Sequence, residues 1–219
     1  SIVLDGAKSV VMIQCVGSRD SERPWCSRVC CSQAVKNALK LKEISPETDV
    51  FVLYRDLRAY GFRESWYTKA REKGVIFIRF QDGKKPVVEK AEKGGLTVTV
   101  EDAALNSPVT LSADLVVLSA GTVPRPENNE LAQMLKVPLN QDKFFLEAHM
   151  KLKPVDFATE GIFLCGLAHS PKTLEESSIQ ACGAAARAST ILSKDRIELE
   201  ANISNVVDEN CDGCAYCVD

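Results

Sequence analysis

The stretch from Gln14 to Cys31, QCVGSRDSERPWCSRVCC, constrains this 219-residue chain more than any other part of its sequence. It joins an apolar run, SVVMI, which predicts a buried strand over residues 10–15, to a helix expected over residues 25–42. A dinucleotide-binding domain carries a glycine-rich fingerprint at such a junction. This segment has a single glycine, Gly17, and four cysteines. We therefore expect a different group to occupy the position of the phosphates.

The following segments predict an α/β fold. Two further apolar runs, DVFVLY at 49–54 and VIFIRF at 75–80, predict strands, and a helix ending at Gly74 separates them. Strands that alternate with helices indicate a Rossmann-like parallel sheet with helices on both faces. Alternating polarity over residues 86–113 then predicts a small antiparallel β-meander, and buried strands are expected at 115–119 and 161–166. Helices are expected at 127–137 and 173–193.

The bulk composition excludes several classes of partner. A net charge of −3 gives no electrostatic basis for binding nucleic acid or an anionic membrane. No apolar run approaches the ~18–20 residues that a membrane-spanning helix needs, and Ser1 does not open a signal peptide. We therefore expect a cytoplasmic protein without direct membrane insertion. Both ends look cut, which predicts that the chain is a fragment of a longer polypeptide.

The nine cysteines are clustered, and clustered cysteines in a reducing compartment indicate metal binding or redox work. If Cys26 and Cys30 lie on a helix, they share one face, with Cys31 about 100° round the axis. Cys15 would stand at the carboxyl end of the preceding strand, where ligands bind in open α/β sheets. The four sulfurs could then meet at one point, near a helix N-terminus that favours thiolates. Inert thiols, a redox dithiol, a zinc site and an iron–sulfur cluster all remain open on spacing alone.

A second group, CDGCAYC, contains Cys211, Cys214 and Cys217. Its C-x2-C-x2-C spacing is the first three-quarters of the bacterial ferredoxin run C-x2-C-x2-C-x3-C-P. The fourth cysteine of such a run would lie beyond Asp219. Zinc or free thiols are the alternatives.

Taken together, these features resemble the A-subunit family of heterodisulfide reductases, which are flavin and iron–sulfur proteins related to thioredoxin reductase. The resemblance covers nearly the whole chain, and CVGSR…WCSRVCC is its most specific part. It implies that a 4Fe–4S cluster is held by Cys15, Cys26, Cys30 and Cys31. It also implies that Cys211, Cys214 and Cys217 are ligands of a second, truncated ferredoxin-like motif.

The same resemblance implies FAD as a cofactor. The segments ADLVVLSAGTVPRP and EGIFLCGLAHSPKTLEESSIQACGAAARAS are similar to the last flavin-contacting parts of such enzymes. Leu167 stands where many relatives have an aspartate for the ribityl chain. The adenine-binding half of the site has no counterpart, so we expect FAD in the parent protein and not tight binding by this chain alone. The cofactor-binding residues implied are Lys36, Gly121, Gly166, Leu167, His169, Lys172 and Thr173.

Three parts and one function are therefore expected. Residues 1–112 would form the Rossmann-like domain with its meander, 113–200 the second half of an FAD-binding domain, and 201–219 the start of a ferredoxin-like motif. The chain would pass electrons between flavin and 4Fe–4S clusters toward partner subunits, with no group acting as acid or base on a substrate. An NAD(P)H-dependent disulfide reductase with a vicinal dithiol, and a non-enzymatic zinc module, are the competing hypotheses.

Overall fold

The computed structural model describes residues 6–92, 94–196 and 206–214. Its first sheet has four parallel strands in the order β3-β2-β1-β7. The strands are β1 (Ser9–Val16), β2 (Asp49–Tyr54), β3 (Ile76–Arg79) and β7 (Leu115–Ala120). This order places the topological switch point between β1 and β7, where the connections leave in opposite directions. The parallel sheet is as predicted.

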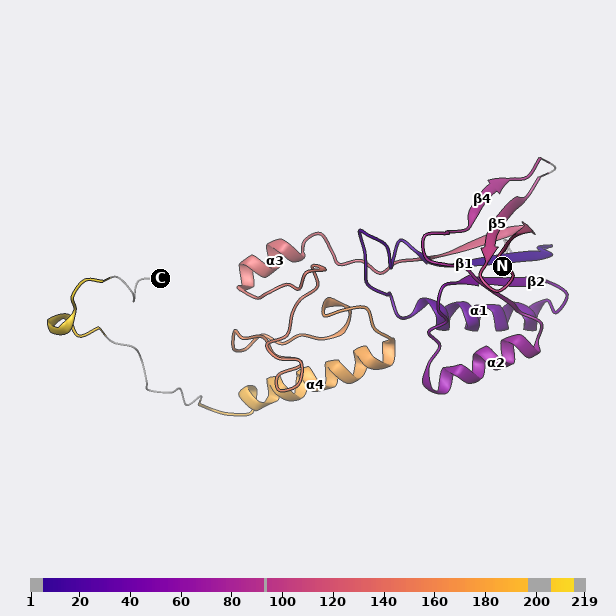
Figure 1. Cartoon of the computed structure of the whole chain (residues 1–219). Helices are drawn as coiled ribbons and strands as arrows, with labels where there is room; N and C mark the ends of the chain where they lie inside the picture. The colour runs from indigo at the N-terminus through magenta and orange to yellow at the C-terminus, as the bar shows by residue number, and fades with distance from the viewer. Residues whose placement is uncertain (1–5, 93, 197–205, 215–219) are drawn as a thin grey trace.

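Helices cover one face of this sheet. They are α1 (Cys30–Ile44) and α2 (Glu64–Glu72), which follows a short 3₁₀ turn, η1 (Gly61–Arg63). Val10 and Met12 of β1 pack against Ala34, Val35 and Ala38 of α1 in the first core. In Figure 1 both helices lie below the strands.

The opposite face carries a three-stranded antiparallel sheet, with β4 (Val87–Lys90), β5 (Leu96–Asp102) and β6 (Ser107–Ala113). Because side chains alternate along a strand, Val11 and Ile13 of β1 point to this side and pack with Val98 and Leu111. The meander is therefore as predicted, and in the described residues it covers the face on which the prediction also placed helices. The meander supplies the second layer.

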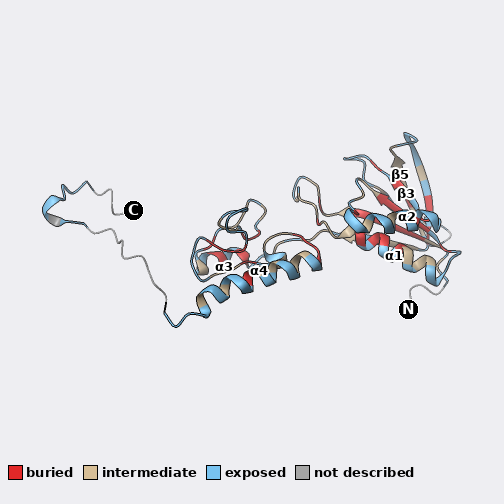
Figure 2. Cartoon of the chain, turned by 90° about the horizontal axis from the view of Figure 1, so that it is seen from below, coloured by how far each residue is buried: buried red, intermediate tan, exposed pale blue. Residues whose placement is uncertain are grey.

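A third core lies beyond β7, around α3 (Asn128–Leu135) and α4 (Leu174–Leu192). Its buried members are Ala132, Val137, Phe145, Phe157 and Leu164. Figure 2 shows buried residues both here and in the strand region. The described chain also contains two further 3₁₀ turns, η2 (Gly166–Ala168) and η3 (Asp208–Asn210).

Two local predictions in this part have different outcomes. The helix expected at 173–193 is present, and it begins with a capping box in which Thr173 and Glu176 exchange hydrogen bonds. The strand expected at 161–166 is absent, because Phe163 makes only a single antiparallel bridge, to Asp156. Its apolar residues are explained by burial of Leu164 in the third core.

The domain boundary expected at 112/113 falls before β7. Since β7 pairs with β1 from Val10↔Leu115 onward, the first sheet extends to Ala120. No helix among the described residues is long and apolar enough to cross a bilayer.

Candidate functional site

Cys15 sits in a break of the β1 ladder. The pairing with β7 shifts register between Ile13 and Val16, and Cys15 has a left-handed backbone with φ of 60°. A β-bulge re-aims the side chain it contains. The bulge therefore removes Cys15 from the strict alternation of the strand, at the carboxyl end of β1 beside the switch point.

The helix begins later than predicted, at Cys30 and not at residue 25. Arg28, with φ of 63°, is in a left-handed conformation that a right-handed helix cannot continue through. Cys26 therefore lies in the loop, so the argument that Cys26 and Cys30 share a helix face is wrong. Two hydrogen bonds fix this loop over the end of β7: Trp25 Nε1 donates to Thr122 O at 2.8 Å, and Thr122 N donates to Ser27 Oγ at 2.8 Å.

The loop still brings the four predicted ligands together. The thiols are close enough that the charge on Cys15, Cys26 or Cys30 would affect the pKa of its neighbours. Cys31 is buried, and the other three are half-buried. The site is therefore a partly enclosed group of four thiols from one strand end, one loop and one helix start.

Burial acts against the ionisation of three of the thiols, those of Cys15, Cys30 and Cys31. Burial raises the pKa of Cys31 to about 11, although the backbone N–H of Arg58 opposes this. Burial and the neighbouring thiols also raise the pKa of Cys30. For Cys15, burial raises the pKa and outweighs the opposing charge of Arg19. Burial therefore opposes the thiolate form that a helix N-terminus would favour, and a bound cation would stabilise that form.

Several polar groups around the thiols face sulfur or have no partner at all. The N–H of Arg28 donates to Cys26 Sγ at 3.3 Å, and Cys31 Sγ donates to Asp56 O at 3.6 Å. The side-chain amide of Gln14 is buried with neither its nitrogen nor its oxygen hydrogen-bonded, and so is Nη1 of Arg19. Unpaired buried donors in a native site call for an additional ligand atom.

Cysteine thiols bind single zinc ions as well as iron–sulfur clusters. The described parts of the chain contain no preformed group of three or more His, Cys, Asp or Glu side chains around one metal position. A tetrahedral zinc site needs four ligands, with each sulfur about 2.3 Å from the ion. In a 4Fe–4S cluster each of four thiolates binds a different iron. The number and chemistry of the four thiols fit such a cluster, and they also fit zinc.

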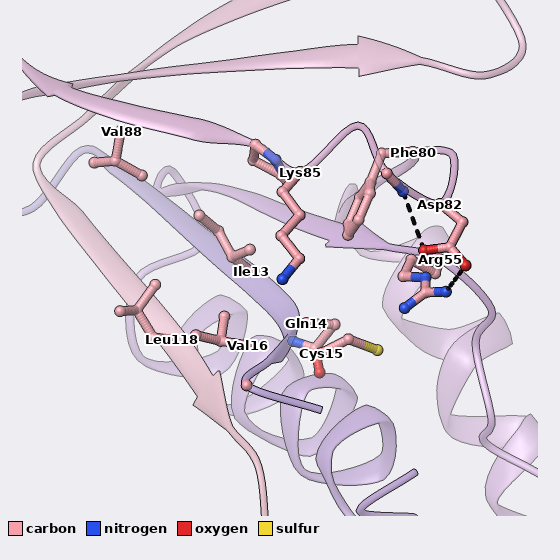
Figure 3. Close-up of a pocket in the computed structure, with 13 residues that line it drawn as sticks. Ile13, Gln14, Cys15, Val16, Arg55, Phe80, Asp82, Lys85, Val88 and Leu118 are labelled. Carbon is pink, nitrogen blue, oxygen red and sulfur yellow. Dashed lines mark hydrogen bonds and ion pairs between the residues drawn. The ribbon is translucent and has the colours of Figure 1, made fainter. Parts of the chain in front are cut away.

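A cavity of about 180 Å³ opens on the meander side of Cys15, as Figure 3 shows. Its apolar walls include Ile13, Phe80 and Leu118. Lys85 extends its ammonium group into the cavity, and Arg55 pairs with Asp82 at its edge. Positive side chains therefore border the thiol site from this side.

Two residues implied for flavin binding meet at a separate depression. Lys36 on α1 and Thr173 at the start of α4 line it together, although they are far apart in the sequence. Trp66 of α2 and Arg63 also line it, and Arg63 forms an ion pair with Glu175. Sequence reasoning missed Arg63 and Trp66, because nothing in their spacing links the α2 segment to α4.

The other residues implied for flavin binding lie just before α4 or after β7. Leu167 is exposed in η2, and Gly166 has φ of 68° and donates its N–H to Gln180 Oε1 at 2.8 Å. Gly121 lies against the cysteine loop, since a Cβ there would be 2.3 Å from the carbonyl oxygen of Gly17. Close packing alone therefore requires this glycine.

His169 and Lys172 belong to an internal network. His169 Nε2 lies 2.8 Å from Glu147 Oε2, while its Nδ1 is 3.2 Å from Lys172 Nζ and 2.9 Å from Gln180 Nε2. Since these two nitrogens can only donate, Nδ1 is the acceptor and Nε2 carries the hydrogen given to Glu147. Burial and the charge of Arg28 lower the pKa of Lys172. In this structure the two side chains are thus engaged within the chain.

The second cysteine group is described only in part. Cys211 and Cys214 are exposed, and Asp212 Oδ1 accepts the N–H of Cys214 at 3.1 Å. Cys217 lies outside the described residues. Metal binding by the three remains a prediction.

The fold and the thiol site together define a class of protein. Of solved structures, a T. acidophilum thioredoxin reductase matches with a TM-score of 0.55 at 13% identity, covering 86% of this chain and 54% of that one. A Lactococcus lactis thioredoxin reductase matches with a TM-score of 0.52 at 18% identity, covering 85% and 52%. The chain therefore has the α/β fold of thioredoxin reductases, which confirms the predicted fold class. No family model matches the sequence.

Curated sequences are more specific. The chain is 42% identical over 216 residues to the second iron–sulfur A-subunit of CoB–CoM heterodisulfide reductase from Methanopyrus kandleri, covering 97% of this chain and 33% of that protein. It is 44% identical over 213 residues to the corresponding iron–sulfur A-subunit of Methanocaldococcus jannaschii, covering 95% and 32%. The chain therefore belongs to the A-subunit family of heterodisulfide reductases, and the predicted resemblance is confirmed. It spans about a third of the length of these relatives.

Proposed function

We propose that this chain is the part of an iron–sulfur flavoprotein oxidoreductase that holds a 4Fe–4S cluster beside an FAD and takes part in electron transfer toward partner subunits. The observation that carries the proposal is the group of four thiols at the switch point, with unpaired donors around it. The names of the relatives, which are iron–sulfur subunits of a reductase, support it. A cytoplasmic location and an assembly with other subunits are part of the same proposal.

Different residues of the chain would hold the cluster and the flavin. Cys15, Cys26, Cys30 and Cys31 would hold the cluster, and Lys36 and Thr173 would border the flavin ring. When bound, the cluster would supply one-electron redox chemistry and the flavin would supply two-electron redox chemistry. The protein would bury the site, orient its ligands and supply hydrogen bonds to sulfur. Such contacts set the potential of a cluster.

The dithiol alternative has less support. A disulfide reductase needs a cysteine of lowered pKa, whereas burial raises the pKa of both Cys30 and Cys31. The loop also lacks the glycines that allow a nucleotide pyrophosphate to approach. A titration with NADPH that changes neither absorbance nor thiol content is the expected result.

The proposal is tested by measuring iron and acid-labile sulfide after anaerobic reconstitution. We expect about four of each per chain from the thiol site, and their loss in the Cys30→Ser/Cys31→Ser variant. The matched control is Cys165→Ser/Cys182→Ser, which removes two exposed cysteines outside both groups. A further variant with serine at 211, 214 and 217 should keep this iron. Equal iron in the wild type and the Cys30→Ser/Cys31→Ser variant would refute the assignment.

A further inference from the structure

Three arginines lie between Cys15 and Cys30 in the sequence, and two of them, Arg19 and Arg28, have separate roles in the structure. Arg28 directs its guanidinium away from the thiols: it bonds Glu176 Oε1 at 2.6 Å, Tyr60 Oη at 3.1 Å and Pro171 O at 3.2 Å. Arg19, in contrast, donates from its guanidinium to the Asp56 carboxylate, and the backbone carbonyl of Asp56 accepts the Cys31 thiol. Of these two side chains, Arg19 is therefore the one placed to act on a group held by the cysteines.

The position of Arg19 is fixed by both its backbone and its side chain. Its N–H donates to Trp25 O at 3.1 Å, and its carbonyl accepts Nη1 of Arg55 at 2.6 Å. Its own Nη2 donates to Asp56 Oδ2 at 2.7 Å. The backbone carbonyl of that same Asp56 accepts the Cys31 thiol. Arg19 and Asp56 thus form a bridge from the Cys15 side of the site to the Cys31 side.

One donor of this guanidinium is unused. Nη1 of Arg19 is buried and makes no hydrogen bond to any described atom, while the side chain as a whole is only 17% exposed. An unpaired buried donor destabilises the folded state, and it does so more strongly when the group is charged. This cationic donor lies beside the thiol site without a partner among the described residues. If reduction makes the sulfur atoms there more negative, they become acceptors for it.

We propose that Arg19, held by Asp56, is a positioning and tuning residue that donates Nη1–H toward the sulfur of the cluster site and raises the reduction potential of the bound cluster. This inference rests on the proposed function. Reduction adds one electron and breaks no bond, so the site gains one negative charge. A fixed, partly buried cation stabilises that negative charge more than a solvent-exposed cation does.

The experiment is a potentiometric titration of the reconstituted full chain with dithionite, followed by electron paramagnetic resonance. Arg19→Gln should shift the equilibrium about tenfold toward the oxidised form, which is a potential about 59 mV lower for a one-electron couple. Arg19→Lys keeps the charge and should stay within about threefold of the wild type. The matched control is Arg79→Gln, which removes the same charge 3.7 Å from the same Asp56 side chain but from a side chain that is 61% exposed. It should also stay within about threefold.

The outcomes separate the two proposals. Iron in all proteins with an unchanged potential in Arg19→Gln, or an equal shift in Arg79→Gln, overturns the role of Arg19 and leaves the cluster assignment standing. No iron in the wild type overturns both. If Arg19→Gln loses its iron while Arg19→Lys keeps it at the wild-type potential, the need for the charge is supported. Loss of iron in both Arg19 variants, but not in Arg79→Gln, reduces Arg19 to a structural residue and overturns the inference.

Discussion

The left-handed residues of the cysteine segment concentrate backbone strain at the site. Cys15, Arg19 and Arg28 have φ of 60°, 57° and 63°, and none of them is glycine. Such conformations cost roughly 1–2 kcal/mol per residue, so the surrounding contacts must hold them in place. The hydrogen bonds of Trp25 and Ser27 to Thr122 are contacts of this kind. The other non-glycine residues with positive φ in the described chain, Asn106, Lys136 and Lys143, are spread over separate turns, so the cysteine segment holds three of six. This enrichment agrees with a functional role for the loop.

Gly121→Ala tests how tightly this loop is packed. The added Cβ would lie 2.3 Å from the carbonyl oxygen of Gly17, a backbone atom that cannot rotate away. We expect a loss of about 1–3 kcal/mol in the free energy of unfolding, measured by urea denaturation. Gly183→Ala is the control, because its Cβ would meet Val155 only at 3.8 Å inside α4. It should stabilise the protein by about 0.5–1 kcal/mol. Equal effects of both would contradict the predicted clash.

At the scale of elements, the start of α4 is joined to the cysteine loop by an ion pair. Glu176 closes the capping box with Thr173 and also binds Arg28, which stands between Cys26 and Cys30 in the sequence. The N-terminus of the helix proposed to face the flavin is therefore held by the loop proposed to hold the cluster. Nothing in the sequence pairs residue 28 with residue 176, since their contact depends on the tertiary fold.

Glu176 gives this junction a pH dependence. The N–H of Thr173 and the Arg28 guanidinium hold the pKa of Glu176 below its ordinary value. The unfolded chain titrates near pH ~4.3, so the contribution of Glu176 is present above that pH and is lost as pH falls through the folded pKa. Glu176→Gln should cost about 0.5–1 kcal/mol at pH 7, a modest figure because the side chain is 37% exposed, and the difference should shrink as pH falls below ~4.3 and vanish below the folded pKa. Urea unfolding across pH 3–7 measures this.

The control for that series is Glu175→Gln. Glu175 also lies in the first turn of α4 and pairs with Arg63, but it takes no part in the capping box. Its substitution should leave the pH profile close to that of the wild type. A profile for Glu176→Gln that parallels the wild type down to pH 3 would show that the carboxylate does not stabilise the junction.

Sequence reasoning predicts the elements more reliably than their contacts. The strand at 49–54 has the predicted bounds, and the helix at 173–193 has them to within its caps, because apolar periodicity and a T-x-x-E capping box are local signals. The predicted start of α1 is too early, because helical spacing cannot reveal that Arg28 is left-handed. The bulge at Cys15 and the close approach of Gly121 to Gly17 depend on the pairing of β1 with β7, which no local pattern encodes.

On the scale of the whole molecule, the cysteine loop contacts both parts of the fold. The four cysteines come from β1, the loop itself and α1, while Arg28 and Trp25 of the loop contact Glu176 and Phe144 in the part of the chain beyond β7. A group that ties residues 15, 26, 30 and 31 together would therefore stabilise more than the loop itself. Binding to the folded state alone raises stability through linkage.

Removal of the cluster should accordingly lower the melting temperature. For a chain of this size, about 2–4 °C corresponds to 1 kcal/mol, so we expect a fall of more than about 5 °C after treatment with ferricyanide and a chelator. Circular dichroism during heating measures it. The Cys30→Ser/Cys31→Ser variant should melt near the treated wild type and should not respond to the treatment. An unchanged melting temperature in the treated wild type would show that the group adds nothing to folding.

The packing of Trp25 has an optical consequence. Its ring meets Phe144 edge-on at 5.7 Å between centroids, its indole N–H is bound to Thr122, and the next residue along the chain is Cys26. The only other tryptophan, Trp66, lies on α2. With Trp66 replaced by phenylalanine, the remaining emission would come from a fluorophore fixed at the seam between the strand region and the third core. Trp25 is thus an intrinsic fluorophore beside the thiols, and an iron-containing chromophore bound there would quench its emission by energy transfer.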